Sequence, residues 1–183
     1  MSQTRGVDGQ GLGTAVSPTL GAGGGVSVTA PTKWGYDIEL ERELERRASN
    51  VDAEVVGKVA EVAFKVAEPF NTTFDNIDWT TTVAITRQDG IADFVYINNR
   101  VMRLPWRRVL PILLKDYPQV VFIDMRKAVK REKVVGALRE ELEQVKEELS
   151  RLARRKSKYA NEMRAIYEKE LNRIIKTLNY LVG

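Results

Sequence analysis

The densest group of side chains able to do chemistry lies in the stretch FVYINNRVMRLPWRR, residues 94–108. Aromatic rings stack on unpaired bases of any sequence, and arginines neutralise phosphates and stack on bases as well. Three rings and four arginines occur together here: Phe94, Tyr96, Trp106, Arg100, Arg103, Arg107 and Arg108. We therefore predict a surface that binds single-stranded nucleic acid. The alternative interpretation is that Phe94 and Tyr96 belong to the core and that Trp106 caps one end of a sheet.

Positive charge is concentrated in one part of the chain, although the formal net charge of the 183 residues is only +4. Residues 1–99 carry 8 Lys/Arg and 14 Asp/Glu, whereas residues 100–131 carry 9 and 2. A basic block within a folded domain indicates a polyanionic partner. Arg87 and Lys115 extend the predicted set of phosphate contacts. A basic face that is merely solvated is the alternative interpretation.

The chain contains no cysteine and no histidine. Disulfides and thiolate metal sites are therefore excluded, and the commonest general base and metal ligand is absent. We expect no metal, no cofactor and no catalysis. The enzymatic alternative is a Mg²⁺-dependent nuclease, whose carboxylates would have to converge on paired ions. Its candidate residues are Asp75, Asp78, Asp89, Asp93 and Asp124, with Lys127 close to the last.

The N-terminal segment, residues 1–33, is rich in glycine, poor in charge and free of aromatic residues. It cannot bury enough apolar area to offset the entropy of ordering, so we predict a flexible Gly-rich tail. Neither an apolar run of membrane-spanning length nor the pattern of a signal peptide is present. We therefore expect a cytoplasmic protein without a membrane partner.

Residues 34–125 have the pattern of an α+β domain, which we expect to bind the nucleic acid. Apolar residues at helical spacing, including a stripe of valines in the second segment, predict two helices before Pro69. Alternation and one continuous apolar run then predict a small four-stranded, mainly antiparallel sheet with helices packed on it. The expected strands are residues 79–87, 91–97, 100–104 and 120–124, with a short helix between Pro105 and Pro118.

Strand alternation assigns the side chains of this sheet to two faces. Val95 is expected on one face, whereas Phe94 and Tyr96 point to the other. In the preceding strand, Trp79 is expected to share a face with Val83. One face covers the two preceding helices, and the other presents Phe94 and Tyr96 among arginines.

The last segment, residues 126–183, contains no proline and one internal glycine near its start. Its apolar residues recur three and four apart, which predicts a coiled-coil helix of about 55 residues and about 80 Å. The expected seam is Leu138, Leu142, Val145, Leu149, Leu152, Tyr159, Met163, Ile166, Leu171, Ile174 and Leu178. A small domain cannot cover such a helix, so we predict a homo-oligomer, dimer or tetramer. The alternative is a helical hairpin, which needs a break near residues 154–160 although neither Gly nor Pro occurs there.

This order of elements resembles ThermoDBP, the single-stranded DNA-binding family of the Thermoproteales. The resemblance covers about residues 34–183: acidic helices, a sheet with aromatic and basic residues, and a C-terminal zipper. It implies a hydrophobic cleft flanked by basic residues, in which the segment GIADFVYINNRVMRLPW holds the bases. It also implies a coiled coil that assembles protomers, a role in replication and repair, and a hyperthermophilic archaeal source.

Two further questions stay open at this point. A coiled-coil assembly or structural protein, with a basic surface for RNA or a packaged genome, is the rival non-enzymatic function. Single-stranded RNA is the rival ligand, because no residue pattern here reads a 2′-hydroxyl.

Overall fold

The computed structural model of the chain describes residues 19–21, 27–29, 34–88 and 92–183. The predicted tail, residues 1–33, lies outside this part except for two short strands that pair antiparallel, β2 (Thr19–Gly21) and β3 (Ser27–Thr29). The side chain of Arg87, the residue Asp89 and the expected turn after residue 88 also lie outside the described part.

Helices form where the sequence pattern and capping residues predict them. Asp37 accepts a hydrogen bond from the Leu40 backbone N–H at 2.9 Å, and Asp52 accepts one from that of Glu54 at 2.8 Å. The valine stripe of the second helix is buried, as its spacing predicts. The helices of this part are α1 (Ile38–Ser49), α2 (Ala53–Val66), the short 3-10 helix η2 (Phe74–Asn76) and α3 (Trp106–Asp116).

The sheet differs from the prediction. It is not a small, four-stranded, mainly antiparallel sheet but a seven-stranded mixed sheet in the order β4-β8-β7-β6-β9-β10-β5. β4 pairs parallel with β8, and β6 pairs parallel with β9; the remaining neighbours are antiparallel. The strands are β4 (Gly35–Tyr36), β5 (Glu68–Pro69), β6 (Thr82–Gln88), β7 (Ala92–Ile97), β8 (Arg100–Arg103), β9 (Gln119–Phe122) and β10 (Lys127–Lys130).

The prediction of a four-stranded sheet was wrong for a physical reason. β4 and β5 contain two residues each, which is too short for any alternation to be visible, and they form by pairing at the sheet edges. β10 adds residues to the sheet that the sequence pattern assigned to the C-terminal helix. The break between the expected strands 91–97 and 100–104, in contrast, is confirmed: it is a turn in which Asn98 and Asn99 adopt positive φ angles of 33° and 56°.

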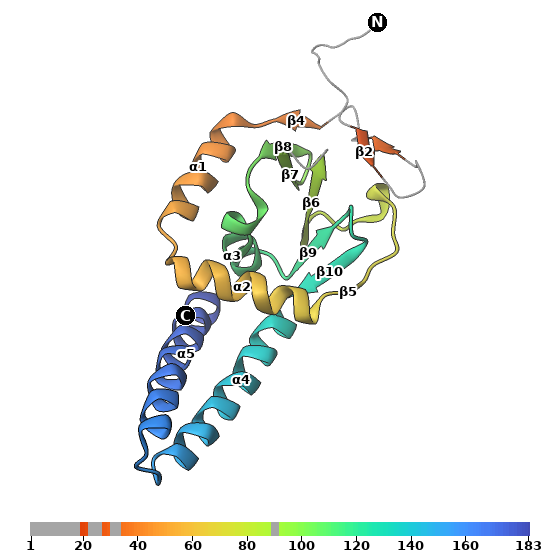
Figure 1. Cartoon of the computed structure of the whole chain (residues 1–183). Helices are drawn as coiled ribbons and strands as arrows, with labels where there is room; N and C mark the ends of the chain where they lie inside the picture. Colours follow the sequence, from red (N-terminus) through yellow and green to blue (C-terminus); the bar gives the residue numbers. More distant parts are fainter. Residues whose placement is uncertain (1–18, 22–26, 30–33, 89–91) are drawn as a thin grey trace, which may run out of the picture.

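Two separate apolar clusters lie on the two faces of the sheet. The larger contains side chains from α1, α2, α3 and the C-terminal helices, together with Val95 and Met102 of the sheet. The smaller lies on the opposite face and contains no side chain from these helices. Figure 1 shows α2 and α3 packed together beside the sheet and the C-terminal helices projecting away from it.

The C-terminal segment is a helical hairpin, so the prediction of a single long helix is wrong. α4 (Arg131–Leu152) ends before a five-residue loop, and α5 (Lys158–Val182) returns toward the sheet. Ser157 caps α5 by accepting a hydrogen bond from the Ala160 N–H at 3.0 Å. Arg164 donates to the backbone oxygens of Leu152 and Arg155 at 2.8 and 3.0 Å. Side-chain hydrogen bonds thus provide the break that Gly or Pro would otherwise provide.

Most of the predicted seam is buried or partly buried within one chain. Leu138, Val145 and Leu152 of α4 and Ile174 and Leu178 of α5 are all buried in the hairpin and its junction with the body. Among the seam residues, Tyr159 and Ile166 remain exposed, by 66% and 59%. The prediction of a homo-oligomer remains a prediction, but the seam no longer requires a partner chain.

None of the helices in the described part is both long enough and apolar enough to cross a membrane.

Candidate functional site

The open face of the sheet, meaning the face that bears the smaller apolar cluster, collects the aromatic residues of the predicted strands. Phe94 lies opposite Arg103 on β8 and Thr86 on β6. Tyr96 lies opposite Val101 on β8 and Ala84 on β6. Because opposite residues in a sheet point to the same side, these six side chains share the open face. The prediction that Phe94 and Tyr96 point to one face of the sheet and Val95 to the other is therefore confirmed.

Four aromatic rings on this face contact one another. Trp34 lies edge-on to Trp79, Phe74 and Tyr96, with centroid separations of 4.6, 5.3 and 5.7 Å. Phe74 lies 5.2 Å from Tyr96 and 5.0 Å from Trp79. Edge-to-face contacts at these distances stabilise aromatic clusters beyond simple burial. Phe70 and Phe94 pack against the same cluster.

The cluster has a buried floor and a partly exposed rim. Phe74 and Tyr96 are buried, at 6% and 0% exposed. Trp34, Phe70, Trp79 and Phe94 are partly exposed, so each presents some ring surface to solvent. We define these four as the aromatic rim. Tyr96 thus supports the rim from below and does not reach the surface.

The Tyr96 hydroxyl is buried without a hydrogen-bond partner among the described residues. Burial raises the pKa of this hydroxyl well above its usual range. An unsatisfied buried hydroxyl costs about 1–3 kcal/mol, so its retention under the rings is not explained by stability.

Exposed arginines lie beside the rim. Arg103 is exposed and directly opposite Phe94 on the neighbouring strand. Arg126, which has a φ of 51°, lines a small apolar hollow of ≈ 50 Å³ together with Phe70 and Phe74. This hollow has room for only a few water molecules, so it does not enclose a base. Ring faces and cations on an open surface suit stacking and phosphate contact better than enclosure of a small molecule.

The β8 edge beside Arg103 is acidic as well as basic. The Arg103 backbone N–H donates to Glu41 at 2.8 Å, and the Tyr36 hydroxyl donates to the same carboxylate. Burial, followed by the hydrogen bond to Glu41, raises the pKa of Tyr36 to about 12. Arg100 lies 3.7 Å from Asp37. Arg100 is thus partly neutralised within the protein, whereas Arg103 keeps its side chain exposed.

The remaining predicted binding residues do not join this surface. Trp106 lies in the larger cluster, 7% exposed, edge-on to Phe64 and Phe122 at 5.3 and 5.5 Å. The Arg107 guanidinium lies over the Trp106 ring at 4.9 Å. Arg108 lies in a hollow that α1 helps to line.

Lys115 does not join the aromatic rim either. Its ammonium lies over the ring of Tyr180 on α5 at 4.7 Å. The basic block therefore spreads over several surfaces and does not form a single cleft. Of the eight predicted residues whose side chains the structure describes, Phe94 and Arg103 are those placed at the aromatic rim.

The sequence prediction did not identify four residues of the site. Trp34, Phe70 and Phe74 were not assigned a role, and Trp79 was assigned to a strand on the wrong face; it precedes β6 and packs on the open face. A signal was present: the loop segment 70–79, FNTTFDNIDW, holds three large aromatic residues among polar ones. Such rings in a loop need an apolar surface to cover, and the nearest one is a sheet.

Two aspartates of the nuclease alternative, Asp78 and Asp93, have other contacts. Asp78 accepts hydrogen bonds from the Thr80 side chain and backbone, at 2.6 and 3.1 Å, as a turn residue does. Asp93 accepts from the Trp106 backbone N–H at 3.0 Å. Among the described residues, the group of carboxylates close enough to share a cation is a different one, Glu61, Glu141 and Glu170.

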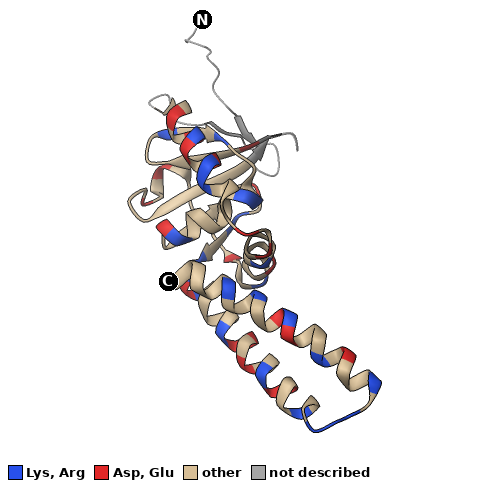
Figure 2. Cartoon of the chain, turned by 90° about the vertical axis from the view of Figure 1, so that its left-hand side faces the viewer, with Lys and Arg blue, Asp and Glu red and all other residues tan. Residues whose placement is uncertain are grey.

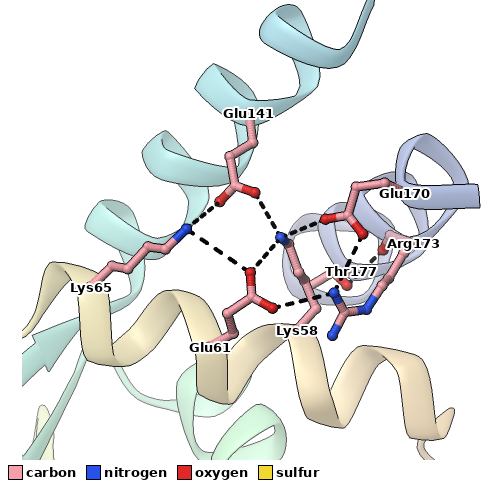
Figure 3. A network of polar contacts seen from close by, with 7 residues as sticks. All are labelled: Lys58, Glu61, Lys65, Glu141, Glu170, Arg173 and Thr177. Atoms are coloured by element: carbon pink, nitrogen blue, oxygen red, sulfur yellow. Dashed lines mark hydrogen bonds and ion pairs between the residues drawn. The ribbon is translucent and has the colours of Figure 1, made fainter. Parts of the chain in front are cut away.

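A lysine already occupies the centre of that carboxylate group. The Lys58 side chain is 1% exposed and donates to Glu141, Glu170 and Glu61 at 2.6, 2.8 and 2.9 Å, as Figure 3 shows. Burial lowers the pKa of Lys58, but the hydrogen bonds to the three carboxylates outweigh it and raise the pKa to about 12.

This ionic cluster joins α2 to both helices of the hairpin. Arg173 adds contacts to Glu61 and Glu170 at 3.3 and 3.4 Å. A Cβ placed on Gly57 would lie 3.3 Å from the Arg173 guanidinium, so the glycine permits this close approach of α5 to α2. The geometry is that of a structural lock, because the cation that the carboxylates hold is supplied by the protein itself.

Comparison with known proteins adds no assignment: no family model, no curated protein and no solved structure matches the chain.

Proposed function

We propose that this protein binds single-stranded DNA, without strong sequence preference, on the open face of its sheet. The observation that supports this best is the aromatic rim: four partly exposed rings on a face that the helices leave uncovered, with Arg103 and Arg126 beside them. The proposed activity is non-enzymatic protection of single strands, in the cytoplasm, during replication and repair.

The chemistry of the rim favours single strands over duplex. Every base has a flat face, and stacking on an aromatic side chain is worth about 1–3 kcal/mol per base. A duplex keeps its bases stacked on one another, so it offers the rim only phosphates. Arg103, opposite Phe94, is placed to meet the phosphate that flanks a base stacked on that ring.

The three tryptophans make the proposal measurable. Trp34 and Trp79 belong to the rim, whereas Trp106 is buried on the other face. In a Trp106→Phe variant, all tryptophan fluorescence comes from the rim. We expect an unstructured thymine oligonucleotide to quench this fluorescence strongly and a matched duplex to quench it weakly. Binding of the duplex and single strand with equal affinity and no quenching would contradict the proposal.

Two substitutions in the same background locate the contact. Phe94→Ala is expected to weaken single-strand binding by about 1–3 kcal/mol. Arg103→Ala is expected to lower the slope of log K against log salt by about 0.7, the value for one phosphate contact on a single strand. The matched control is Arg108→Ala, which removes the same charge away from the rim and should leave the slope unchanged. An RNA oligonucleotide of the same length measures the preference for DNA.

A further inference from the structure

The loop that joins α4 to α5 carries the most concentrated charge of the described chain. Residues 151–158, RLARRKSK, contain five cations and no carboxylate: Arg151, Arg154, Arg155, Lys156 and Lys158. We call this segment the basic tip. Figure 2 shows it at the far end of the hairpin, with the connecting loop blue along its length.

The charges of the basic tip are largely unneutralised. Arg151 forms an ion pair with Glu148 at 2.9 Å. The other four cations are exposed, and within the described part of the chain none of them has an ion-pair partner. Like charges crowded into one turn repel one another. A loop that served only to reverse the chain would not need them, because Gly or Asn does that at no electrostatic cost.

The shape of the tip is nevertheless well defined. Arg164 donates to the backbone oxygens of Leu152 and Arg155 and to the Asn161 side chain, the last at 3.0 Å. Ser157 caps the first turn of α5. The backbone of the loop is therefore held from the inside by Arg164 and Ser157, which leaves the four unpaired cations outside. The C-terminus of α4 and the N-terminus of α5 lie together at the tip, so their opposite partial charges offset each other and the charge of the tip comes from its side chains.

We propose that the basic tip is a second nucleic-acid contact, which binds the phosphates of the strand beyond the segment stacked on the aromatic rim. That the ligand is a nucleic acid rests on the proposed function. The charge and the shape of the tip are observed independently of it. Tyr159, 66% exposed beside the tip, offers one more ring for an unpaired base. Phosphates spaced along a strand fit a row of exposed cations that have no protein partners.

The hairpin sets a lower limit on the length of strand that reaches both sites. α4 has 22 residues, which corresponds to about 33 Å at 1.5 Å per residue. At about 3.4 Å per stacked nucleotide, the hairpin alone spans about 10 nucleotides, and the rim lies farther away, on the face of the sheet opposite the one against which the hairpin packs. A strand of about 6 nucleotides can therefore occupy the rim alone, whereas one of about 40 can occupy the rim and the tip together. Linking two contacts on one strand raises affinity through effective concentration.

The test uses the full chain with Arg154, Arg155 and Lys156 replaced by alanine. Short-strand binding is read from tryptophan quenching, and long-strand binding from the anisotropy of a labelled thymine 40-mer. We expect unchanged short-strand affinity, a loss of at least tenfold in long-strand affinity, and a fall of about 2 in the salt slope for the long strand. The control replaces Lys133, Lys146 and Lys169, exposed residues along the hairpin, and carries the same change in net charge.

Each outcome decides between the alternatives. Equal long-strand affinity in the tip variant and the control overturns the proposal. Absence of rim quenching in the unmodified chain refutes the rim site, while tip-dependent binding of the 40-mer would still support the basic tip. Tip-dependent binding to anionic phospholipid vesicles, with 40-mer affinity unchanged, would assign the tip to a membrane surface and overturn the proposal. Circular dichroism of both variants verifies that the helices are intact.

Discussion

The two faces of the sheet carry similar aromatic residues in different settings. On the helix-covered face, Trp106 at the start of α3 lies edge-on to Phe64 of α2 and Phe122 of β9. Trp106 is 7% exposed, whereas Phe64, at the border of this face, is 40% exposed. On the open face, Trp34 and Trp79 pack in the same edge-on manner, 4.6 Å apart, but both keep part of their rings exposed. The comparison shows that coverage by helices, and not aromatic content, separates the buried Trp106 from the tryptophans of the candidate binding surface.

The difference follows from what is available to cover each face. Helices α1, α2 and α3 provide long apolar stripes for one side of the sheet. The other side is contacted by Trp34 and by the loop that contains Phe70 and Phe74, and β2 also contacts β6. A loop contributes isolated rings where a helix contributes a continuous stripe, so the rings on the open face cover one another only in part.

The largest expected effect is a difference in stability between substitutions on the two faces of the sheet. Trp106→Ala should lower the free energy of unfolding by about 3–5 kcal/mol, the usual cost of removing a large buried ring. Trp79→Ala should cost about 1–2 kcal/mol, because part of that ring is already in water. Urea denaturation of the two variants measures both values. If the two costs were equal, the open face would be ordinary core and the comparison would fail.

A second stability test concerns the lock between α2 and the hairpin. Lys58→Ala leaves three carboxylates facing one another and should cost about 3 kcal/mol, toward the low end for a broken buried ion cluster because the carboxylates are partly exposed. Lys65→Ala removes a lysine of the same cluster whose side chain is 61% exposed, and should cost less than about 1 kcal/mol. Urea denaturation compares the two; a small cost for Lys58→Ala would show that the lock is dispensable.

The same lysine gives a pH dependence with a defined sign. The folded-state pKa of Lys58 is raised to about 12 from an ordinary value of 10.5. The stability that it contributes is therefore fully present below pH 10.5 and is lost as the pH rises through about 12. The difference in unfolding free energy between the unmodified chain and Lys58→Ala should shrink over this window. A difference that stays constant between pH 10 and 12 would contradict the assignment.

The smallest expected effect concerns the floor of the open face. Tyr96→Phe removes a buried hydroxyl that has no partner among the described residues, so stability should stay the same or rise by up to about 1 kcal/mol. Thermal unfolding, read as Tm, measures the change. A clear fall in Tm would show that the hydroxyl has a stabilising partner in solution. Single-strand affinity of the same variant reports whether the hydroxyl contributes to the rim.

Local features were predictable because they depend on neighbours in the sequence. The capping by Asp52, the buried valines of α2, the turn at Asn98 and Asn99, and the opposite orientation of Phe94 and Val95 all follow from short spacings. The other three residues of the aromatic rim, Trp34, Phe70 and Trp79, were not predictable in the same way. They lie in a loop and beside a two-residue strand, and no periodicity links them to the sheet that they cover.

The sequence by itself determined the α+β character, the helices α1, α2 and α3, the strands β6, β7, β8 and β9, and the position of the basic block. Only the tertiary structure decided which rings share a face, where the basic residues point and whether the C-terminal helix is one or two. The reason is that these depend on contacts between distant residues. Lys58 meets Glu141 and Glu170 across 83 and 112 residues, and Arg164 folds back on the end of α4. Sequence spacing does not predict such pairs, because they form only when the chain folds.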